Sequence, residues 1–307
     1  MKKDLLSEND LEKVDFDEIF RRAAILKERQ KDNDHPLTLS GKVLGMIFEK
    51  ASTRTRLSFE VGMYQLGGLA IFMSDRDTQL KRGESIVDTA KVMSRYVDGI
   101  MIRTYKQEAL EEFAKNASVP VINGLTDLLH PCQILTDIFT IVERRKTYEG
   151  VHIAYVGDGN NIANSWINAA AKLPIRCTLA CPQGYDPDQG ILEHARKNNA
   201  DVTIDRDPIK AVQKADVIYT DVWVSMGKEE EHRERIKCFK DYQVNEELIK
   251  HAPKDVLVMH CLPAHRGEEI TAGVIDGEHS VIYDQAENRL HVQKAILEIL
   301  LSGGKGK

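Results

Sequence analysis

The segment Ser52-Thr53-Arg54-Thr55-Arg56 gathers three hydroxyl groups and two guanidinium groups at the start of an expected helix, shortly after an expected strand over residues 43–48. The first N–H groups of a helix lack partners and the helix dipole is positive there, so such a terminus binds anions. Arginines can add bidentate contacts to a phosphate. The pattern predicts a phosphate site, although no P-loop motif is present. The alternative is an ordinary Ser/Thr helix cap followed by solvated arginines.

A second helix start carries an imidazole and a carboxamide, in His130-Pro131-Cys132-Gln133. Proline suits the first helical position, so we expect His130 to cap the helix and Gln133 to lie one turn in, facing the same way. Both side chains could polarise the carbonyl of a bound anion. The alternative is a histidine that only caps or packs.

The turn Gly157-Asp158-Gly159-Asn160-Asn161-Ile162 lies between an expected strand and an expected helix, as the dinucleotide-binding motif G-x-G-x-x-G does. Here Ile162 replaces the third glycine, and the two asparagines would crowd a pyrophosphate. Amide side chains at the carboxyl end of a strand suit a zwitterion better. We therefore expect an amino-acid contact from this turn, with an NAD-linked dehydrogenase as an alternative.

Two more strand ends in the second half of the chain carry polar or reactive groups. Asp221 precedes Ser225-Met226-Gly227, and Cys261 lies in His260-Cys261-Leu262-Pro263. A carboxylate could hold a substrate ammonium, and a thiolate beside it could influence the protonation of an amine. The alternative for Cys261 is a small buried hydrophobe. No metal site is expected, because neither C-x-x-C nor H-E-x-x-H spacing occurs.

These motifs follow apolar, β-rich runs that alternate with helical patterns along most of the chain. Such alternation is typical of βαβ units around parallel sheets. It predicts an α/β fold with two doubly wound parallel sheets in tandem, a helix over residues 131–145 and a last helix over residues 285–301. The expected strands are 43–48, 69–73, 99–102, 120–123, 151–156, 177–181, 202–204, 217–220 and 256–260.

The chain length of 307 residues suits two domains at roughly 100–200 residues each. The polar stretch 144–150 after the helix at 131–145 is the best boundary. We therefore predict a first domain over residues 1–145, a second over 146–285, and a C-terminal helix and tail over 286–307.

The charge balance argues against nucleic-acid or anionic-membrane partners. Lysines and arginines number 42 against 48 acidic residues, for a net charge of −6, and the longest basic run is Arg144-Arg145-Lys146. The sequence has no apolar stretch of about 18 residues and no apolar core of a signal peptide near its start. Its five cysteines are scattered, as is usual for reduced thiols. We expect a cytoplasmic protein.

The order and spacing of these motifs over residues 1–301 resemble the aspartate/ornithine carbamoyltransferase family. Ser52-Thr53-Arg54-Thr55-Arg56 is similar to the carbamoyl-phosphate motif of that family, and His130-Pro131-Cys132-Gln133 to its second motif. Asp221 with Ser225-Met226-Gly227, and the motif around Cys261, resemble the segments that distinguish the ornithine enzymes from the aspartate enzymes.

The resemblance implies a role for each matching residue. Arg103, His130 and Cys261 would be catalytic, and Gln79 would reach the site of a neighbouring subunit. The C-terminal helix would pack back on the first domain. The implied carbamoyl-phosphate ligands are Ser52, Thr53, Arg54, Thr55, Gln79, Arg103, His130, Gln133, Cys261, Leu262 and Arg289, and the implied ornithine ligands are Asn161, Asp221, Ser225 and Met226.

The resemblance also implies a reaction without metal or organic cofactor, in which the δ-amine of ornithine attacks carbamoyl phosphate. It implies a homotrimer, or a multiple of trimers, with shared active sites in arginine metabolism. The same site serves the anabolic and the catabolic direction, so the sequence leaves the direction open. Three alternatives also stay open: a non-catalytic anion-binding protein on the same scaffold, a dehydrogenase, and a carbamoyltransferase for another amine or amino acid.

Overall fold

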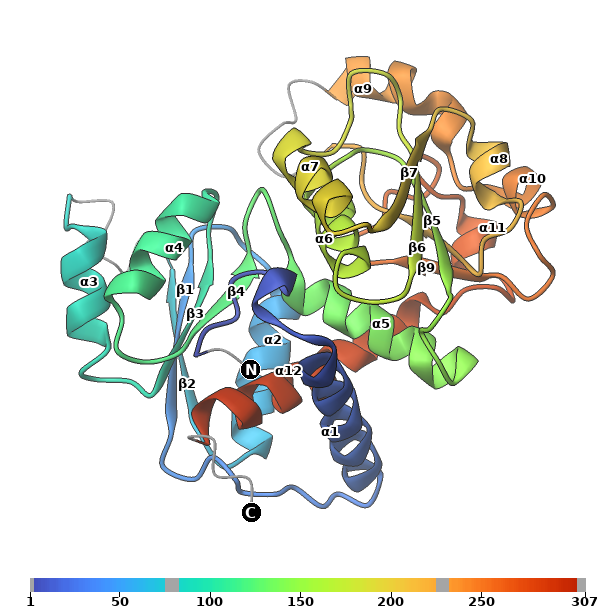
Figure 1. The fold of residues 1–307 in the computed structure, drawn as a ribbon. Coiled ribbons are helices and arrows are strands. Elements are labelled where there is room, and N and C mark those ends of the chain that lie inside the picture. The colour runs from blue at the N-terminus through green and yellow to red at the C-terminus, as the bar shows by residue number, and fades with distance from the viewer. Residues whose placement is uncertain (1–2, 75–82, 225–231, 303–307) are drawn as a thin grey trace. The chain divides into compact units, whose positions relative to one another are not determined.

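The structure is a computed structural model that describes residues 3–74, 83–224 and 232–302. The chain forms two compact units (Figure 1). The first unit comprises Met1–Thr136 and Glu287–Lys307, and the second comprises Asp137–Ala286. The division falls within helices α5 (Pro131–Arg145) and α12 (Ile282–Leu301), which both contribute residues to each unit. Among the described residues, none of the helices combines the length and the apolar character that crossing a bilayer requires.

The first unit contains a parallel four-stranded sheet in the order β2-β1-β3-β4. The central strand β1 (Val43–Phe48) is almost wholly apolar and buried, as expected for a parallel strand with both faces covered. Strands β2 (Leu69–Ser74) and β3 (Gly99–Arg103) pair with it on either side, and β4 (Val121–Leu125) pairs with β3.

Helices cover both faces of this sheet (Figure 1). On one face, α3 (Ile86–Met93) and α4 (Gln107–Asn116) pack their apolar residues against β1, β3 and β4. On the other face, α2 (Thr53–Gln65) packs against α12 so closely that a Cβ at Gly62 would lie 3.3 Å from the Lys294 side chain. The C-terminal helix therefore packs back on the first unit, as predicted. The unit also contains the 3₁₀ helix η1 (Glu8–Asp10) and helix α1 (Lys13–Lys31).

The second unit contains a parallel five-stranded sheet in the order β7-β6-β5-β8-β9. Helices α6 and α7 lie on one side of it, and α8 and α10 on the other (Figure 1). Its strands are β5 (His152–Val156), β6 (Arg176–Ala180), β7 (Asp201–Asp205), β8 (Val217–Thr220) and β9 (Leu257–His260). Its helices are α6 (Asn161–Ala170), α7 (Gln189–Lys197), α8 (Pro208–Val212), α9 (His232–Phe239), η4 (Lys240–Tyr242), α10 (Glu246–Ile249) and α11 (Ala272–Ile275).

The predicted fold class is confirmed, with two doubly wound parallel sheets in tandem. Each of the nine expected strands is present; β1 and β8 have the expected ends, and the ends of the other seven differ by at most two residues. The helix expected over residues 131–145 has those bounds, because Pro131 begins it and no helix breaker follows until Lys146 at φ +67°. The last helix begins slightly earlier than expected, at Ile282.

Candidate functional site

Both units place their candidate residues where the strand order reverses. In the first unit β1 lies between β2 and β3, and in the second β5 lies between β6 and β8. In open α/β sheets, ligands bind outside the carboxyl ends of the strands at such points. Ser52 follows β1 and Arg103 ends β3, whereas Asn161 follows β5 and Asp221 follows β8. Each unit therefore presents one candidate ligand site.

The α2 start in the first unit is a true helix cap. The Ser52 side chain accepts a hydrogen bond of 3.2 Å from the Thr55 backbone N–H. Thr53 is exposed, Arg54 is half-buried and Thr55 is buried. Ser52 thus caps the helix, and the remaining first-turn N–H groups and the Arg54 side chain are candidates for contacting an anion at the same helix end.

Arg289 from α12 connects two of the motifs in the first unit. Its Nη2 donates to Thr55 Oγ1 at 2.9 Å, and its Nη1 donates to Gln133 Oε1. All three side chains are buried. These bonds orient the guanidinium without cancelling its charge, because a hydroxyl and a carboxamide are neutral. The structure therefore brings together Thr55, Gln133 and Arg289, which the resemblance assigned to one ligand.

His130 directly precedes α5, and its carbonyl oxygen accepts the N–H of Ile134. The imidazole is buried, and its pKa lies well below the usual range because of burial and the nearby guanidiniums of Arg289, Arg103 and Arg54. His130 is therefore neutral near neutral pH. A neutral imidazole beside three guanidiniums can contact a carbonyl while the arginines neutralise a phosphate dianion.

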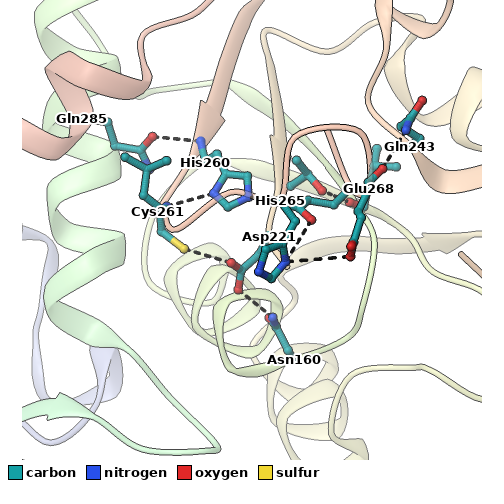
Figure 2. A network of polar contacts seen from close by, with 12 residues as sticks. Asn160, Asp221, Gln243, His260, Cys261, His265, Glu268 and Gln285 are labelled. Atoms are coloured by element: carbon teal, nitrogen blue, oxygen red, sulfur yellow. Dashed lines mark hydrogen bonds and ion pairs between the residues drawn. The ribbon is translucent and has the colours of Figure 1, made fainter. Parts of the chain in front are cut away.

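In the second unit, Asp221 is the centre of the candidate site (Figure 2). Its Oδ1 accepts a hydrogen bond of 3.1 Å from the Cys261 thiol, and its Oδ2 accepts one of 2.7 Å from Asn160 Nδ2. Both donors are neutral, so the carboxylate keeps its negative charge for a cationic group. The structure thus places Asp221 and Cys261 together, as the resemblance implied.

Asn160, which directly precedes the predicted ornithine ligand Asn161, contacts Asp221. The Asn160 side-chain oxygen also caps α6 through the N–H groups of Ile162 and Ala163, and accepts from the Tyr155 hydroxyl. Asn160 therefore supports the site from within the protein. Asn161 is half-buried and is the first residue of α6.

The turn after β9 holds Cys261 and Leu262 in an unusual backbone conformation. Leu262 has φ +58° and precedes a cis proline bond. Its N–H donates to His260 Nδ1 at 2.9 Å, so the imidazole proton lies on Nε2, which donates to Glu269 Oε1 at 3.1 Å. The His260 N–H in turn donates to Gln285 Oε1 at 3.0 Å (Figure 2). A residue with positive φ outside glycine is strained, and such strain often occurs at functional sites.

Sequence reasoning missed the supporting roles of His260 and Glu269. His260 lies inside the motif that contains Cys261, which was a usable signal. Glu269 follows another glutamate in the sequence, and nothing distinguishes the buried residue from its neighbour before the fold is known.

The geometry of Gly159 does not support the dinucleotide alternative. A Cβ on Gly159 would lie 2.3 Å from the Pro187 backbone nitrogen. This glycine is therefore required by the packing of the turn against residues 185–187, and not by close approach to a pyrophosphate. Its role differs from that of the second glycine in dinucleotide-binding turns.

Donor atoms of Asp221, His260 and Cys261 lie within 4.8 Å of one another and could in principle hold a metal ion. Both His260 ring nitrogens are engaged in hydrogen bonds, however. We therefore interpret this group as a hydrogen-bond network. The thiols of Cys132, Cys177 and Cys181 are buried. Burial raises the pKa of the first two to about 12 and that of Cys181 even further, so these residues have packing roles.

Three predicted site residues lie outside the described residues. They are Gln79, Ser225 and Met226.

Comparison with known proteins covers almost the whole chain. Residues 3–143 match the family described as aspartate/ornithine carbamoyltransferase, carbamoyl-P binding domain, and residues 149–300 match its Asp/Orn binding domain. The chain is 64% identical to an ornithine carbamoyltransferase of Syntrophus aciditrophicus over 302 residues, covering 98% of this chain and 100% of that protein.

Solved structures show the same similarity. The ornithine carbamoyltransferase from Pyrococcus furiosus aligns with a TM-score of 0.94 at 51% identity, covering 98% of this chain and 97% of that one. The anabolic ornithine carbamoyltransferase from Campylobacter jejuni aligns with a TM-score of 0.91 at 40% identity, covering 98% and 99%. The chain therefore belongs to the aspartate/ornithine carbamoyltransferase family.

Proposed function

We propose that this protein transfers the carbamoyl group of carbamoyl phosphate to the δ-amine of L-ornithine, giving L-citrulline and phosphate. The observation that carries the proposal is that one chain contains two clusters of opposite charge. The first unit gathers arginines around a helix start and a neutral imidazole, which suit an acyl phosphate. The second presents the Asp221 carboxylate with a thiol, which suit an amino acid with a reacting amine.

The reaction requires little covalent chemistry from the protein. The neutral amine nitrogen forms a bond to the carbamoyl carbon, the bond from that carbon to the phosphate oxygen breaks, and phosphate leaves with the electron pair. The leaving phosphate takes the proton that the amine loses. The residues we assign to carbamoyl phosphate are Ser52, Thr53, Arg54, Thr55, Gln79, Arg103, His130, Gln133, Cys261, Leu262 and Arg289.

Within this set, Arg54, Arg103 and the start of α2 neutralise the phosphate. Thr55, Arg103, His130 and Gln133 stabilise the oxyanion of the tetrahedral intermediate. We assign ornithine to Asn161, Asp221, Ser225 and Met226, with Cys261 beside the reacting amine as a tuning residue. Positioning and electrostatics then supply the rate.

An acceptor panel tests the proposal directly. Purified protein is mixed with carbamoyl phosphate and, separately, with ornithine, putrescine, N-acetylornithine or aspartate, and the carbamoylated product and phosphate are measured. We expect turnover with ornithine alone. Turnover with another acceptor would reassign the substrate, and phosphate binding without turnover would indicate a non-catalytic anion-binding protein.

We further propose a homotrimer, or a multiple of trimers, with Gln79 contributed to a neighbouring site. Exposed apolar side chains on the first unit support self-association. They lie on α2 and on the edge strand β2, which leads into the segment that contains Gln79. These residues and their exposed fractions are Leu57 (53%), Val61 (36%), Tyr64 (78%), Leu69 (58%) and Ile71 (43%).

Subunit complementation tests the shared site. Inactive Gln79→Ala and Arg54→Ala subunits are mixed, dissociated and reassociated. If sites are shared, some interfaces pair an intact pocket with an intact Gln79, so activity should reappear well above either parent. No recovery in mixed trimers proven by mass spectrometry would place each site within one chain.

We also propose a role in arginine biosynthesis in the cytoplasm. Similarity to the anabolic enzyme of Campylobacter jejuni supports the direction, and five free cysteines fit a reducing compartment. Expression of this chain should restore growth without arginine to a bacterial strain that cannot convert ornithine to citrulline. Failure of an expressed, catalytically active protein to restore growth would contradict the anabolic assignment.

A further inference from the structure

A second cluster of imidazole and carboxylate groups lies in the loop that follows the Cys261 turn. The donor atoms of His265, Glu268 and Glu269 all lie within 4.8 Å of one another. His265 Nδ1 is 3.9 Å from Glu268 Oε2 and 3.8 Å from Glu269 Oε2. His232, at the start of α9, places its Nε2 3.3 Å from Glu268 Oε1. Glu269 also supports the candidate amino-acid site through His260, whereas His232, His265 and Glu268 are assigned no role in the proposed carbamoyl transfer.

Glu269 is the buried carboxylate of the cluster. The residue has no exposed surface, and its Oε1 accepts from His260 Nε2 at 3.1 Å and from the His265 N–H at 2.6 Å. Its Oε2 is buried and has no hydrogen-bond partner. Burying a carboxylate oxygen without a donor is costly. This oxygen faces His265, so a cation held between the two would remove the cost.

The loop that carries these groups is held by several hydrogen bonds. Gln243 Nε2 donates to the carbonyl oxygens of Gly267 and Glu268 at 2.9 and 2.8 Å (Figure 2). The Gly267 N–H donates to the Ile270 carbonyl, and Gly267 has φ +94°, which favours glycine. The backbone of the loop is therefore held in place before any ligand binds.

We propose that His265, Glu268 and Glu269 form a binding site for a divalent transition-metal ion of the Zn²⁺ or Co²⁺ type, with a water molecule as the fourth ligand. Mixed imidazole and carboxylate donors suit these ions, whereas all-oxygen sites suit Ca²⁺ and Mg²⁺. Metal bonds of about 2.0–2.2 Å place tetrahedral donors roughly 3.4 Å apart. The two separations from His265, 3.8 and 3.9 Å, need to close by about half an ångström, and the donor oxygens of Glu268 and Glu269 lie within 4.8 Å of each other.

The site has a direct connection to the candidate amino-acid site. Glu269 binds His260, and His260 Nδ1 holds the Leu262 N–H beside Cys261. A metal ion on Glu269 would therefore act on the turn that carries Cys261 and Leu262. We expect metal binding to change the KM for the amino-acid substrate more than the KM for the phosphate substrate.

Cobalt titration of the metal-depleted protein tests the site, because Co²⁺ reports its own ligands. We expect one Co²⁺ per chain with visible d–d absorption typical of tetrahedral coordination and no thiolate-to-cobalt charge-transfer band. The double variant His265→Ala/Glu268→Gln should bind at least about 100-fold more weakly, since loss of even an outer-shell partner costs 10–100-fold. The matched control His251→Ala/Glu247→Gln removes an exposed histidine and glutamate near α10 and should bind like the unchanged protein.

Two further measurements make each outcome decisive. Zn²⁺ should raise the melting temperature of the unchanged protein and of Cys261→Ser, but not of the double variant, whose own melting temperature shows whether it folds. A charge-transfer band that disappears in Cys261→Ser would place the metal on the Asp221 and Cys261 group and overturn the proposal. Equal, weak binding by the double variant and the control would show an ordinary ion-pair cluster and also overturn it.

Discussion

The two candidate sites carry opposite charges, and they are built from elements that lie at different distances along the sequence. In the first unit, the cationic cluster draws on α2, β3, α5 and α12, and Arg289 contacts a residue 234 positions away in sequence. In the second unit, the anionic group is Asp221 at a strand end, held by donors from the neighbouring strand ends. A site for a phosphate dianion thus requires convergence of distant elements, whereas a site for an ammonium is built within one sheet edge.

Neutral hydrogen-bond partners preserve the charge in both sites. Arg289 donates to a hydroxyl and a carboxamide, and Asp221 accepts from a carboxamide and a thiol. These bonds fix geometry and do not themselves neutralise the charged group. Arg235 and Asp158 in the second unit differ, because they form a buried ion pair at 2.8 Å. That pair neutralises itself, so we assign it to stability.

The largest expected effect is on the cationic cluster. Arg54→Ala should lower kcat/KM for carbamoyl phosphate by at least about 100-fold, because a charge-assisted hydrogen bond contributes about 1.5–3 kcal/mol and a bidentate guanidinium loses two. Arg54→Lys should not restore activity, since an ammonium lacks the planar fork. Steady-state kinetics measure both variants. Arg56→Ala is the control, because Arg56 pairs with Glu60 on its own helix at 2.9 Å. Near-normal turnover of Arg54→Ala would place the phosphate elsewhere.

The buried ion pair should matter for folding of the second unit. Arg235→Ala leaves Asp158 buried without this partner and should reduce the free energy of unfolding by about 3–5 kcal/mol. The chain has two tryptophans, Trp166 and Trp223, and both lie in the second unit. Urea unfolding followed by tryptophan fluorescence therefore reports on this unit alone.

The control for this change is Arg233→Ala, which removes an exposed arginine from the same helix. It should change the free energy of unfolding by less than about 0.5 kcal/mol. Equal stability of Arg233→Ala and Arg235→Ala would show that the ion pair contributes nothing.

The strands were the easiest feature to predict from the sequence, because parallel strands covered on both faces are apolar runs bounded by polar turns. Ser52 and Pro131 likewise mark their helix starts through local chemistry. Such signals lie within a few residues of each other, so they do not depend on the tertiary fold.

Features that depend on long-range packing could not be predicted in this way. Arg289 was assigned only through the family resemblance, because no local pattern links α12 with Thr55. The contact of Asn160 with Asp221 depends on which of two adjacent amides caps α6. The positive φ of Leu262 accompanies a hydrogen bond from its N–H to the His260 side chain. Each requires the three-dimensional position of a second residue.

A smaller effect is expected on the stability of the first unit. It would show whether a buried positive charge outside the cationic cluster destabilises that unit. Lys294 on α12 has no exposed surface, and its ammonium donates to Gln65 Oε1 at 2.9 Å. Burial lowers its pKa from 10.5 to about 8. The unfolded chain therefore binds this proton between pH 8 and 10.5 while the folded chain has lost it, so the contribution to stability rises with pH across that window.

Lys294→Met removes this pH dependence. Between pH 7 and 10.5 the unchanged protein should gain on the order of 3 kcal/mol relative to the variant, since one pKa unit corresponds to about 1.36 kcal/mol. Hydrogen exchange of peptides from α12, measured by mass spectrometry at both pH values, reports on this helix. A stability difference that stays constant with pH would show that Lys294 keeps its ordinary pKa when folded.

The smallest expected effect concerns Cys261 in the second unit. It would show whether this thiol takes part in the reaction, in addition to the charge that Asp221 supplies. Cys261→Ser keeps a donor to Asp221 but replaces the thiol by a hydroxyl that does not ionise in the working range. We expect kcat/KM for ornithine to fall by roughly tenfold, as for loss of one hydrogen bond of about 1.4 kcal/mol. In both proteins the rate should rise with pH, because the amine, with an ordinary pKa of about 10.4, must lose its proton to attack. If thiol ionisation contributes, the profile of Cys261→Ser should shift and keep only the component due to the amine.

Cys238→Ser removes an exposed thiol and serves as the control. Because no covalent intermediate is proposed, turnover should persist in Cys261→Ser. Its complete loss, or isolation of a carbamoylated Cys261 that forms and decays at the rate of turnover, would replace direct attack by a covalent mechanism and make the second unit a chemical partner rather than an electrostatic one.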